Sequence, residues 1–166
     1  LSGKQFLVYP ANNAEKQHTP FAEIMGLLES APMEQGIRTA ALDIFQLLAE
    51  AEAKVHGIAP DQVTFHEVGS WDSITDIVSA AFLIQRLNIN SASCTPLPLG
   101  SGRVQTTHGL LPVPAPATAE LLRDLPVIDD GIPGERVTPT GAAILKYLRP
   151  QPRQPLSTLL KTIGMG

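Results

Sequence analysis

Apolar residues recur at alternating four- and three-residue steps through the segment from Met33 to His56. One face of an α-helix repeats in this way, so the spacing predicts a long amphipathic helix over these residues. Gly57 follows directly and is a typical C-terminal stop, because glycine adopts the left-handed conformation that ends many helices. Glu50 and Lys54 are four residues apart and are expected to pair on the outer face. The predicted buried face consists of Ile37, Ala41, Ile44, Leu48, Ala51 and Val55.

Two further helices are predicted on either side of this one. Thr19 and Pro20 fit an N-cap followed by proline at the first helical position, which predicts a short helix that ends near Glu29. Beyond Trp71, apolar residues again follow a helical spacing and stop near Asn88. The apolar face of this third helix is expected at Ile74, Ile77, Val78, Ala81, Leu83 or Ile84, and Leu87.

Proline changes the pattern in the second half of the chain, where eleven of the fifteen prolines lie between Pro96 and Pro155. Proline removes the hydrogen-bond donors of a sheet, so residues 94–99 are predicted to be an extended segment at a sheet edge or along a cleft. The remaining predicted elements are short strands at 104–107, 127–128 and 136–137, a short helix over 114–123 and a last helix over 142–148.

The alternation of helices and short strands predicts an α/β or α+β domain, in which three or four helices flank a small mixed sheet and the proline-rich segments line a cleft. The domain is expected to cover residues 19–148, after a loose arm at 1–18 and before a proline-rich linker and tail at 149–166. A composition of 43% hydrophobic and 17% charged residues is that of a globular protein.

Charge and targeting signals narrow the expected partners and location. The net charge is −4 and lysines and arginines form no run, which argues against nucleic acid or a membrane surface as a partner. No apolar stretch approaches the ~20 residues of a membrane-spanning helix, and the amino end lacks a signal-peptide pattern. The lone Cys94 fits a reducing compartment, so a cytoplasmic protein is expected.

Polar groups that can bind metal concentrate where a predicted strand at 63–65 leads into the third helix. His66 and Glu67 follow the strand, and Asp72 and Asp76 lie at the predicted helix start. One imidazole and three carboxylates suit a divalent ion such as nickel, zinc, manganese or magnesium. A purely structural role is the alternative, in which Asp72 and Asp76 favour the positive end of the helix dipole.

Capping is part of that structural alternative. Ser73 is a good N-cap, and Asp76 three residues later would complete a variant of the capping box. His66 could equally be a histidine with satisfied hydrogen bonds at the end of a strand.

The other three histidines differ in their expected roles. His108 lies in a polar turn between apolar segments, where an imidazole is free to bind a ligand or to act in acid–base catalysis. His56, in the last turn of the long helix, is expected to be a favourable C-terminal charge. His18, in the N-terminal arm, is expected to be exposed without a function.

Two segments could hold an anion. Gly100, Ser101 and Gly102 offer free backbone amides and a hydroxyl, and Thr138 and Thr140 open a helix whose N-terminal amides point outward. Neither segment matches the P-loop or the dinucleotide fingerprint. An ordinary turn and plain helix capping are the alternatives.

Four of these motifs together resemble a known family. They are F-H-E-V-G-S-W-D-S-I-T-D-I at 65–77, T-P-L-P-L-G-S-G-R-V at 95–104, T-H-G-L-L-P-V-P-A-P-A-T at 107–118 and T-P-T-G-A-A-I-L at 138–145. In this order they resemble the nickel-insertion proteins of the lactate racemase maturation system. The resemblance spans residues 19–148, and I-G-M-G at 163–166 extends it.

The resemblance implies a nickel chelatase of the lyase class. Such an enzyme inserts nickel into a pyridinium mononucleotide that bears two thiocarboxylates, and forms the nickel-pincer nucleotide cofactor. The reaction consumes CTP with a divalent metal, magnesium or manganese. The implied partners are the pyridinium mononucleotide and lactate racemase or other maturation proteins, and a homo-oligomer is left open.

The matching positions carry the expected site, with roles inferred from residue type. As metal ligands we expect His66, Asp72, Asp76 and His108, and as catalytic residues Glu67 and His108. Nucleotide contacts are expected at Gly100, Ser101, Gly102, Thr138 and Thr140.

Two departures from the family pattern indicate a central piece of a longer protein. The opening D-x-x-x-G-x-x-G-D-M-like motif is absent, and the chain stops at Gly166, before the C-terminal domain that the family associates with CTP and metal. Two other classes of function stay open: a non-catalytic nucleotide- and metal-binding or scaffold domain, and a metal-dependent phosphohydrolase that uses the same carboxylates.

Overall fold

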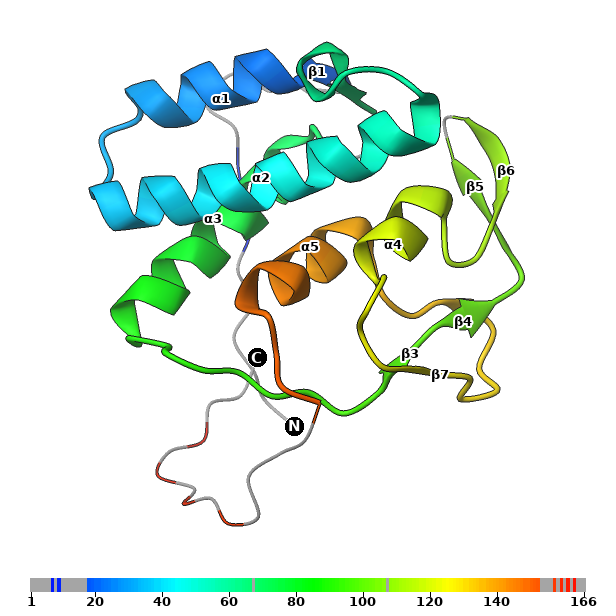
Figure 1. The fold of residues 1–166 in the computed structure, drawn as a ribbon. Coiled ribbons are helices and arrows are strands. Elements are labelled where there is room, and N and C mark those ends of the chain that lie inside the picture. The colour runs from blue at the N-terminus through cyan, green and yellow to red at the C-terminus, as the bar shows by residue number, and fades with distance from the viewer. Residues whose placement is uncertain are drawn as a thin grey trace.

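The computed structural model describes residues 18–66, 68–106 and 108–152, together with residues 7, 9, 157, 159, 161 and 163. Most of the predicted arm (1–18) and tail (149–166) lies outside the described residues. Within them the fold mixes helices and short strands, as predicted (Figure 1). The helices are α1 (Phe21–Ser30), α2 (Gln35–His56), the 3-10 helix η1 (Pro60–Gln62), α3 (Trp71–Arg86), α4 (Pro116–Leu121) and α5 (Pro139–Leu148).

The long helix α2 is the centre of the molecule. It contacts α1, α3, α4 and α5 and crosses the fold from one side to the other (Figure 1). The sequence prediction of one long helix ending at Gly57 is confirmed: Gly57 has φ +67° and caps the helix in the left-handed conformation. The helix begins two residues later than predicted. None of the described helices is long and apolar enough to cross a membrane.

Burial on α2 is broader than the predicted stripe. The predicted positions Ile37 to Ala51 are buried, and so are Phe45 and Ala49 on neighbouring faces. Four helices surround α2, so a single apolar stripe could not cover all of its contacts. The last predicted position, Val55, is 43% exposed.

The predicted pair of Glu50 with Lys54 on α2 is replaced by contacts of each side chain with another residue. The Lys54 ammonium lies 2.6 Å from the Glu120 carboxylate of α4, and Glu50 accepts a hydrogen bond from Gln46 at 3.0 Å. Lys54 therefore pairs with a residue of another helix, α4, and not with Glu50 of its own helix.

The N-caps of α1 and α3 differ from those expected from the sequence. Thr19 is not the N-cap of α1: its buried hydroxyl donates to the Gly69 carbonyl at 2.8 Å, and Pro20 is the N-cap. The third helix begins at Trp71 after Ser70, so the predicted capping box with Ser73 as N-cap is wrong.

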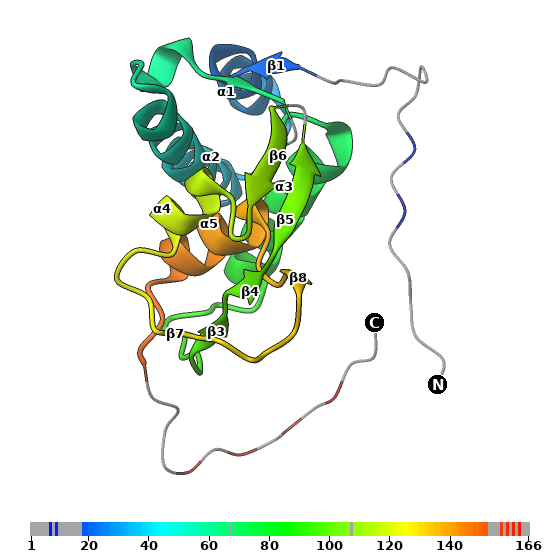
Figure 2. The same cartoon turned by 90° about the vertical axis from the view of Figure 1, so that its right-hand side faces the viewer.

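The described strands form four two-stranded sheets instead of the one small sheet that was expected. The strands are β1 (Thr19–Pro20), β2 (Thr64–Phe65), β3 (Leu97–Pro98), β4 (Gly100–Ser101), β5 (Arg103–Thr106), β6 (Gly109–Pro112), β7 (Val127–Ile128) and β8 (Gly134–Glu135). The pairs are β1–β2, β3–β7, β4–β8 and the hairpin β5–β6 (Figure 2). The strand predicted at 136–137 lies two residues earlier, as β8.

The proline-rich segment is extended, as predicted, and β3 pairs with β7 in parallel. The Leu97 amide donates to the Pro126 carbonyl at 2.8 Å and the Leu99 amide to the Ile128 carbonyl at 3.0 Å. Parallel pairing uses alternate residues of a strand, so Pro96 and Pro98 occupy the positions at which no donor is needed.

Candidate functional site

Antiparallel pairing of β1 with β2 brings two distant histidines together. Thr19 is paired with Phe65, so His18, one residue before β1, and His66, one residue after β2, are the next facing pair. Their ring centres are 4.9 Å apart. The hydrogen bond from the Thr19 hydroxyl to the Gly69 carbonyl holds the loop after His66 against β1.

The turn of the β5–β6 hairpin presents His108. The register pairs Thr106 with Gly109, which leaves two residues in the turn. The Thr106 hydroxyl accepts from the His108 amide at 3.1 Å and donates to the Gly109 carbonyl at 3.0 Å. Gly109 has φ +96°, which glycine adopts without strain.

The C-terminal end of α2 presents His56. Its Nε2 lies 3.5 Å from a carboxylate oxygen of Glu52, one turn earlier on the same helix. The side chain of His56 is 40% exposed and that of Glu52 is 23% exposed. Gly57 turns the chain directly after His56 and leads it through η1 to β2.

All four histidines of the chain therefore lie in one row. The order is His18, His66, His108, His56, and the ring centres of neighbours are 4.9, 4.6 and 5.2 Å apart. The rings meet edge to face at the first two contacts and are tilted at the third. The sequence predicted functions for His66 and His108 only.

Three of these histidines line a small pocket of about 150 Å³. Its other walls are mostly apolar and come from α2, the β5–β6 hairpin, and the starts of α4 and α5. Apart from Glu52 and Thr106, the described lining is imidazole or apolar: Val55, His56, His66, Val68, His108, Leu111, Ala115, Pro116, Ala117 and Pro139. The exposure of Val55 is thereby explained, because the residue faces the pocket and not the core.

A second, more open hollow of about 310 Å³ adjoins the same row. It is lined by Ile58, Gln62, Val63 and Thr64 together with His56 and His66. These two imidazoles therefore stand between the hollow and the pocket.

The predicted carboxylate ligands lie elsewhere on the described surface. Asp72 and Asp76 are exposed on the first turns of α3, and neither is among the described residues that line the pocket. Glu67 lies outside the described residues. Across the described part of the chain, no three His, Cys, Asp or Glu side chains are grouped so that they could hold a metal ion.

The carboxylate of Asp72 has a local partner. A hydrogen bond from the Ser70 side chain lowers the pKa of Asp72 below its ordinary value, although partial burial acts in the opposite direction. The backbone amides of Ser73 and Asp72 also bind the carboxylate and lower the pKa. Asp72 thus stabilises the first turn of α3.

The two segments predicted to bind an anion are neighbours in the fold. β4 pairs with β8, which ends three residues before Thr138. Thr138 is the N-cap of α5, and its hydroxyl accepts from the Gly141 amide at 3.2 Å. Gly100 has φ +74°, and a Cβ there would lie 2.1 Å from the Gly134 carbonyl oxygen. Pro139, the first residue of α5, reaches the histidine pocket.

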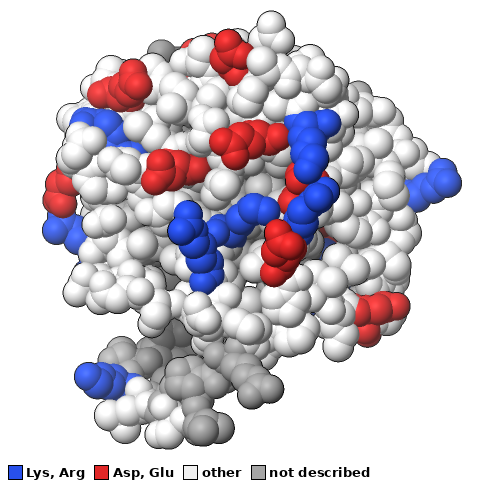
Figure 3. All heavy atoms as spheres, in the orientation of Figure 1, with Lys and Arg blue, Asp and Glu red and all other residues white. Residues whose placement is uncertain are grey.

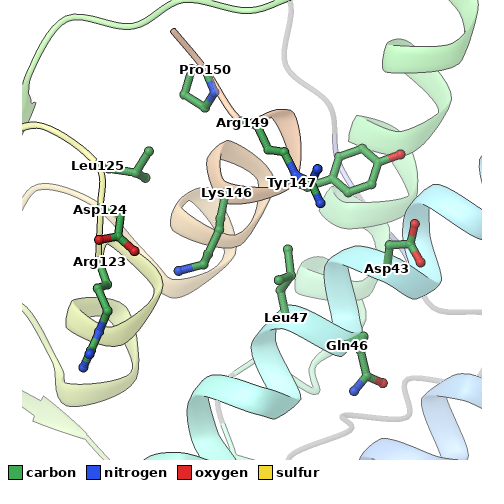
Figure 4. A pocket seen from close by; sticks show the side chains of 10 residues that line it. All are labelled: Asp43, Gln46, Leu47, Arg123, Asp124, Leu125, Lys146, Tyr147, Arg149 and Pro150. Atoms are coloured by element: carbon green, nitrogen blue, oxygen red, sulfur yellow. The ribbon is translucent and has the colours of Figure 1, made fainter. Parts of the chain in front are cut away.

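A larger cavity of about 860 Å³ lies at the other end of α5 (Figure 4). It shares no lining residue with the histidine pocket. Three basic side chains line it, but Arg123 is paired with Glu120 at 2.7 Å, and Lys146 donates to the Leu121 carbonyl at 3.2 Å.

The charges around this cavity are balanced. Asp43 and Asp124 accompany Arg123, Lys146 and Arg149 in the lining, and basic and acidic side chains are interspersed on the face seen in Figure 3. The charged side chains that line this cavity are of mixed sign, whereas the histidine row brings four side chains of one metal-binding type together.

Sequence reasoning missed His18, His56 and Glu52. One signal was available: His56 and His66 are separated by a helix stop and a single short turn, which brings the end of α2 close to the start of the loop after β2. The position of His18 depends on the register of β1 with β2, and two-residue strands leave no pattern in a sequence.

Comparison with known proteins agrees with a nickel-handling role. The family model described as nickel insertion protein matches residues 1–166. The chain is 53% identical over 148 residues to a provisionally named nickel insertion protein of Geobacter sulfurreducens, covering 89% of the chain and 38% of that protein. It is 47% identical over 132 residues to a protein of the same provisional name from Methanocaldococcus jannaschii, covering 79% and 35%.

These relatives are much longer than the present sequence, which spans less than two fifths of their length. Comparison with solved structures found no match to this chain. The family match over the whole length and the identity to these relatives support the same assignment: the chain belongs to the nickel insertion protein family.

Proposed function

We propose that this chain is the nickel-handling domain of a longer enzyme that inserts nickel into a pyridinium mononucleotide bearing two thiocarboxylates. The product would be the nickel-pincer nucleotide used by lactate racemase, and the complete protein would consume CTP with magnesium or manganese. Nickel is a substrate in this reaction. The proposal rests on membership of the family and on the chemistry of the histidine pocket.

The observation that carries the proposal is the pair His66 and His108 at the wall of the pocket. Their ring centres are 4.6 Å apart. With about 2.1 Å for a metal–imidazole bond and about 1.1 Å from nitrogen to ring centre, two imidazoles bound at 90° to one ion would have centres about 4.5 Å apart. The observed separation is thus one at which both rings can share an ion.

Exchange of ligands would drive the transfer. Imidazole nitrogens bind nickel well, but a soft thiocarboxylate sulfur competes effectively for it. Two protein ligands leave most coordination positions of the ion to water, and the sulfur atoms of the substrate can replace that water. The protein would therefore hold the ion loosely enough to release it.

A base is also needed, because a nickel–carbon bond forms at a ring carbon that first carries a proton. That proton must leave as the bond to nickel forms, so one proton is transferred to the protein or to water for each nickel inserted. His108 lies in the pocket wall, and the nitrogen that held the ion can accept the proton once the ion has moved to the substrate. Glu67 was predicted for the same role, and Glu52 is a further carboxylate in the pocket lining.

The size and walls of the pocket fit the ring of the substrate. An apolar cavity of about 150 Å³ can hold a ring the size of benzene, and the pocket has this volume. Because Pro139 is part of its lining, a ring bound there would place an attached phosphate toward the start of α5. The N-terminal amides of a helix attract such a group, so Thr138 and Thr140 stay the proposed nucleotide contacts, with Gly100, Ser101 and Gly102 on the neighbouring strand.

The proposal is tested first by nickel binding. Calorimetric titration of the chain with Ni²⁺ should give measurable affinity, and His66→Ala and His108→Ala should each weaken it about tenfold or more. The matched control is Gln85→Ala, an exposed position on α3 that lines neither the pocket nor the adjoining hollow. Asp72→Ala and Asp76→Ala test the carboxylates predicted from the sequence.

Turnover separates catalysis from simple binding. The full-length natural protein should form a nickel-containing nucleotide, detected by mass spectrometry, and the two histidine variants should lose it. Binding that survives in both variants would disprove the histidine site. Nickel binding with normal turnover in both variants would assign this domain a non-catalytic role, and metal-stimulated phosphate release without a nickel product would assign a phosphohydrolase.

A further inference from the structure

We infer that His18 and His56 are also nickel ligands, and that the row of four imidazoles passes the ion from its exposed end at His18 into the substrate pocket. The inference rests on the proposed function of His66 and His108 and extends it to the two ends of the row. His18 would receive the ion first, and His56, whose neighbour Glu52 attracts the cation, would hold it beside the substrate.

The distances between neighbouring ring centres are those expected for two imidazoles bound to one ion. Two imidazoles on one ion have ring centres about 4.5 Å apart at a 90° angle and about 5.2 Å apart at a tetrahedral angle. The three neighbouring pairs are separated by 4.9, 4.6 and 5.2 Å. The separation of every neighbouring pair is therefore compatible with two rings on one ion, and each inner histidine belongs to two pairs.

The pocket gives the row a direction, because His56, His66 and His108 line it and His18 does not. His56 and His66 line both the hollow of about 310 Å³ and the pocket of about 150 Å³, so the imidazoles form part of the wall between them. The hollow is larger and has Gln62 and Thr64 in its lining, which suits a hydrated ion. The pocket is smaller and mainly apolar, which suits a ring and excludes water.

The two ends of the row differ in chemistry. His18 is exposed and is not part of the pocket lining, so it is open to an ion arriving from solvent. At the other end the Glu52 carboxylate lies 3.5 Å from Nε2 of His56. A carboxylate at this distance attracts a cation electrostatically, so the inner end should hold the ion more firmly than the outer end.

The small number of protein ligands at each position would let the ion move along the row. No three metal-binding side chains in the described ranges are grouped to hold an ion, so each position offers a pair of imidazoles and not a closed site. Structural metal sites close the ion in with four protein ligands, whereas sites that exchange a ligand keep positions open. A series of open positions favours transfer over storage.

Simple packing of aromatic rings would also give edge-to-face contacts at these distances. Packing and ligation are separated by replacing histidine with phenylalanine, which keeps the ring and removes the nitrogens. His18→Phe and His56→Phe should preserve the fold, as measured by circular dichroism melting, and should change nickel transfer. His18→Gln and His56→Gln are the second set, for use where a phenylalanine variant fails to fold.

The experiment measures two rates in the chain by stopped-flow spectroscopy: uptake of Ni²⁺, and transfer from the loaded protein to dithiothreitol as a sulfur acceptor. We expect the His18 variant to slow uptake about tenfold or more and to leave transfer unchanged. We expect the His56 variant to slow transfer by a similar factor and to leave uptake unchanged. Gln85→Ala, an exposed position on α3 that lines neither cavity, is the control for both rates.

Two results would overturn the inference in different ways. If the His18 and His56 variants match the parent in both rates while His66→Ala and His108→Ala lose nickel, the relay is wrong and the proposed function stands. If the parent chain itself binds no nickel, both are wrong. Loss of uptake and transfer together in every variant would indicate one shared site in place of a path.

Discussion

Asp72 shows how a residue that fits a metal site by type can have a structural role by position. The sequence places it near His66, but in the structure it lies on the first turn of α3 and accepts a hydrogen bond from Ser70. The pKa of its carboxyl is lower than the ordinary value of 3.8. The folded state therefore favours the charged form of this group, and stability is linked to pH.

The sign of that linkage gives a prediction. Because the pKa is lower in the folded state, the stabilisation is complete above pH 3.8, the ordinary pKa, and is lost as the pH falls through the lower pKa of the folded protein. Asp72→Asn should thus destabilise the protein slightly at pH 7, and the difference from the parent should shrink on acidification. Urea unfolding at pH 7 and below pH 3.8 measures the difference, and Asp76→Asn controls for net charge. A difference that does not change with pH would contradict the prediction.

The sequence predicted a function for two of the four histidines in the row. His66 and His108 stand out because each lies in a polar loop next to a strand. His56 and His18 were assigned to helix-end charge and to an exposed arm. His18 could not be recognised, because its local sequence does not reveal which distant residue lies beside it. For His56 the signal was the single short turn that separates it from His66.

Among the secondary-structure elements, α5 shows the clearest agreement between local signal and structure. Thr138 was weighed as a phosphate contact and as a helix cap, and its hydroxyl accepts a hydrogen bond from the Gly141 amide. Pro139 occupies the first helical position, where a missing amide hydrogen has no cost. Capping does not prevent the remaining N-terminal amides from binding an anion.

The cap can be tested by stability. Thr138→Ala should cost about 1 kcal/mol of unfolding free energy, the usual loss for a removed cap, and Thr138→Ser should restore most of it. Urea denaturation monitored by circular dichroism measures both. No loss in the alanine variant would show that this hydrogen bond contributes nothing to the helix.

The helices were predicted more accurately than the strands for a physical reason. A helix such as α2 repeats its apolar face many times within one segment, so the signal accumulates along the chain. Most strands here have two residues, and each is defined by a partner far away in the sequence. That is why the strand at 136–137 was misplaced and why four separate pairs could not be distinguished from one sheet.

Across the whole molecule, the core is organised by contacts of α2 with the other helices. Phe45 lies at its middle with 0% exposure, and its ring centre is 6.2 Å from that of Phe65 in β2. The same core therefore holds α2 in place and positions the strand that carries His66. Stability and site geometry depend on shared residues.

Truncation of this residue should have a large effect. Phe45→Ala is expected to cost about 3–5 kcal/mol, because a large buried ring leaves a cavity. Phe82→Ala is the matched control: its ring is 42% exposed and contacts Arg86, so its loss should cost less than about 1 kcal/mol. Thermal or urea unfolding compares them, and similar losses in both variants would contradict the description of the core.

The row of histidines has a further consequence for the way the chain folds. Its members are residues 18, 56, 66 and 108, so an ion shared by two of them would act as a reversible cross-link between segments that are remote in the sequence. The pairs of neighbouring histidines exist only in the folded protein, and an ion that binds only the native state stabilises that state by mass action. Nickel supply would then regulate the lifetime of the folded protein, and each release of the ion to a substrate would briefly loosen the contacts between the end of α2, the loop after β2 and the hairpin.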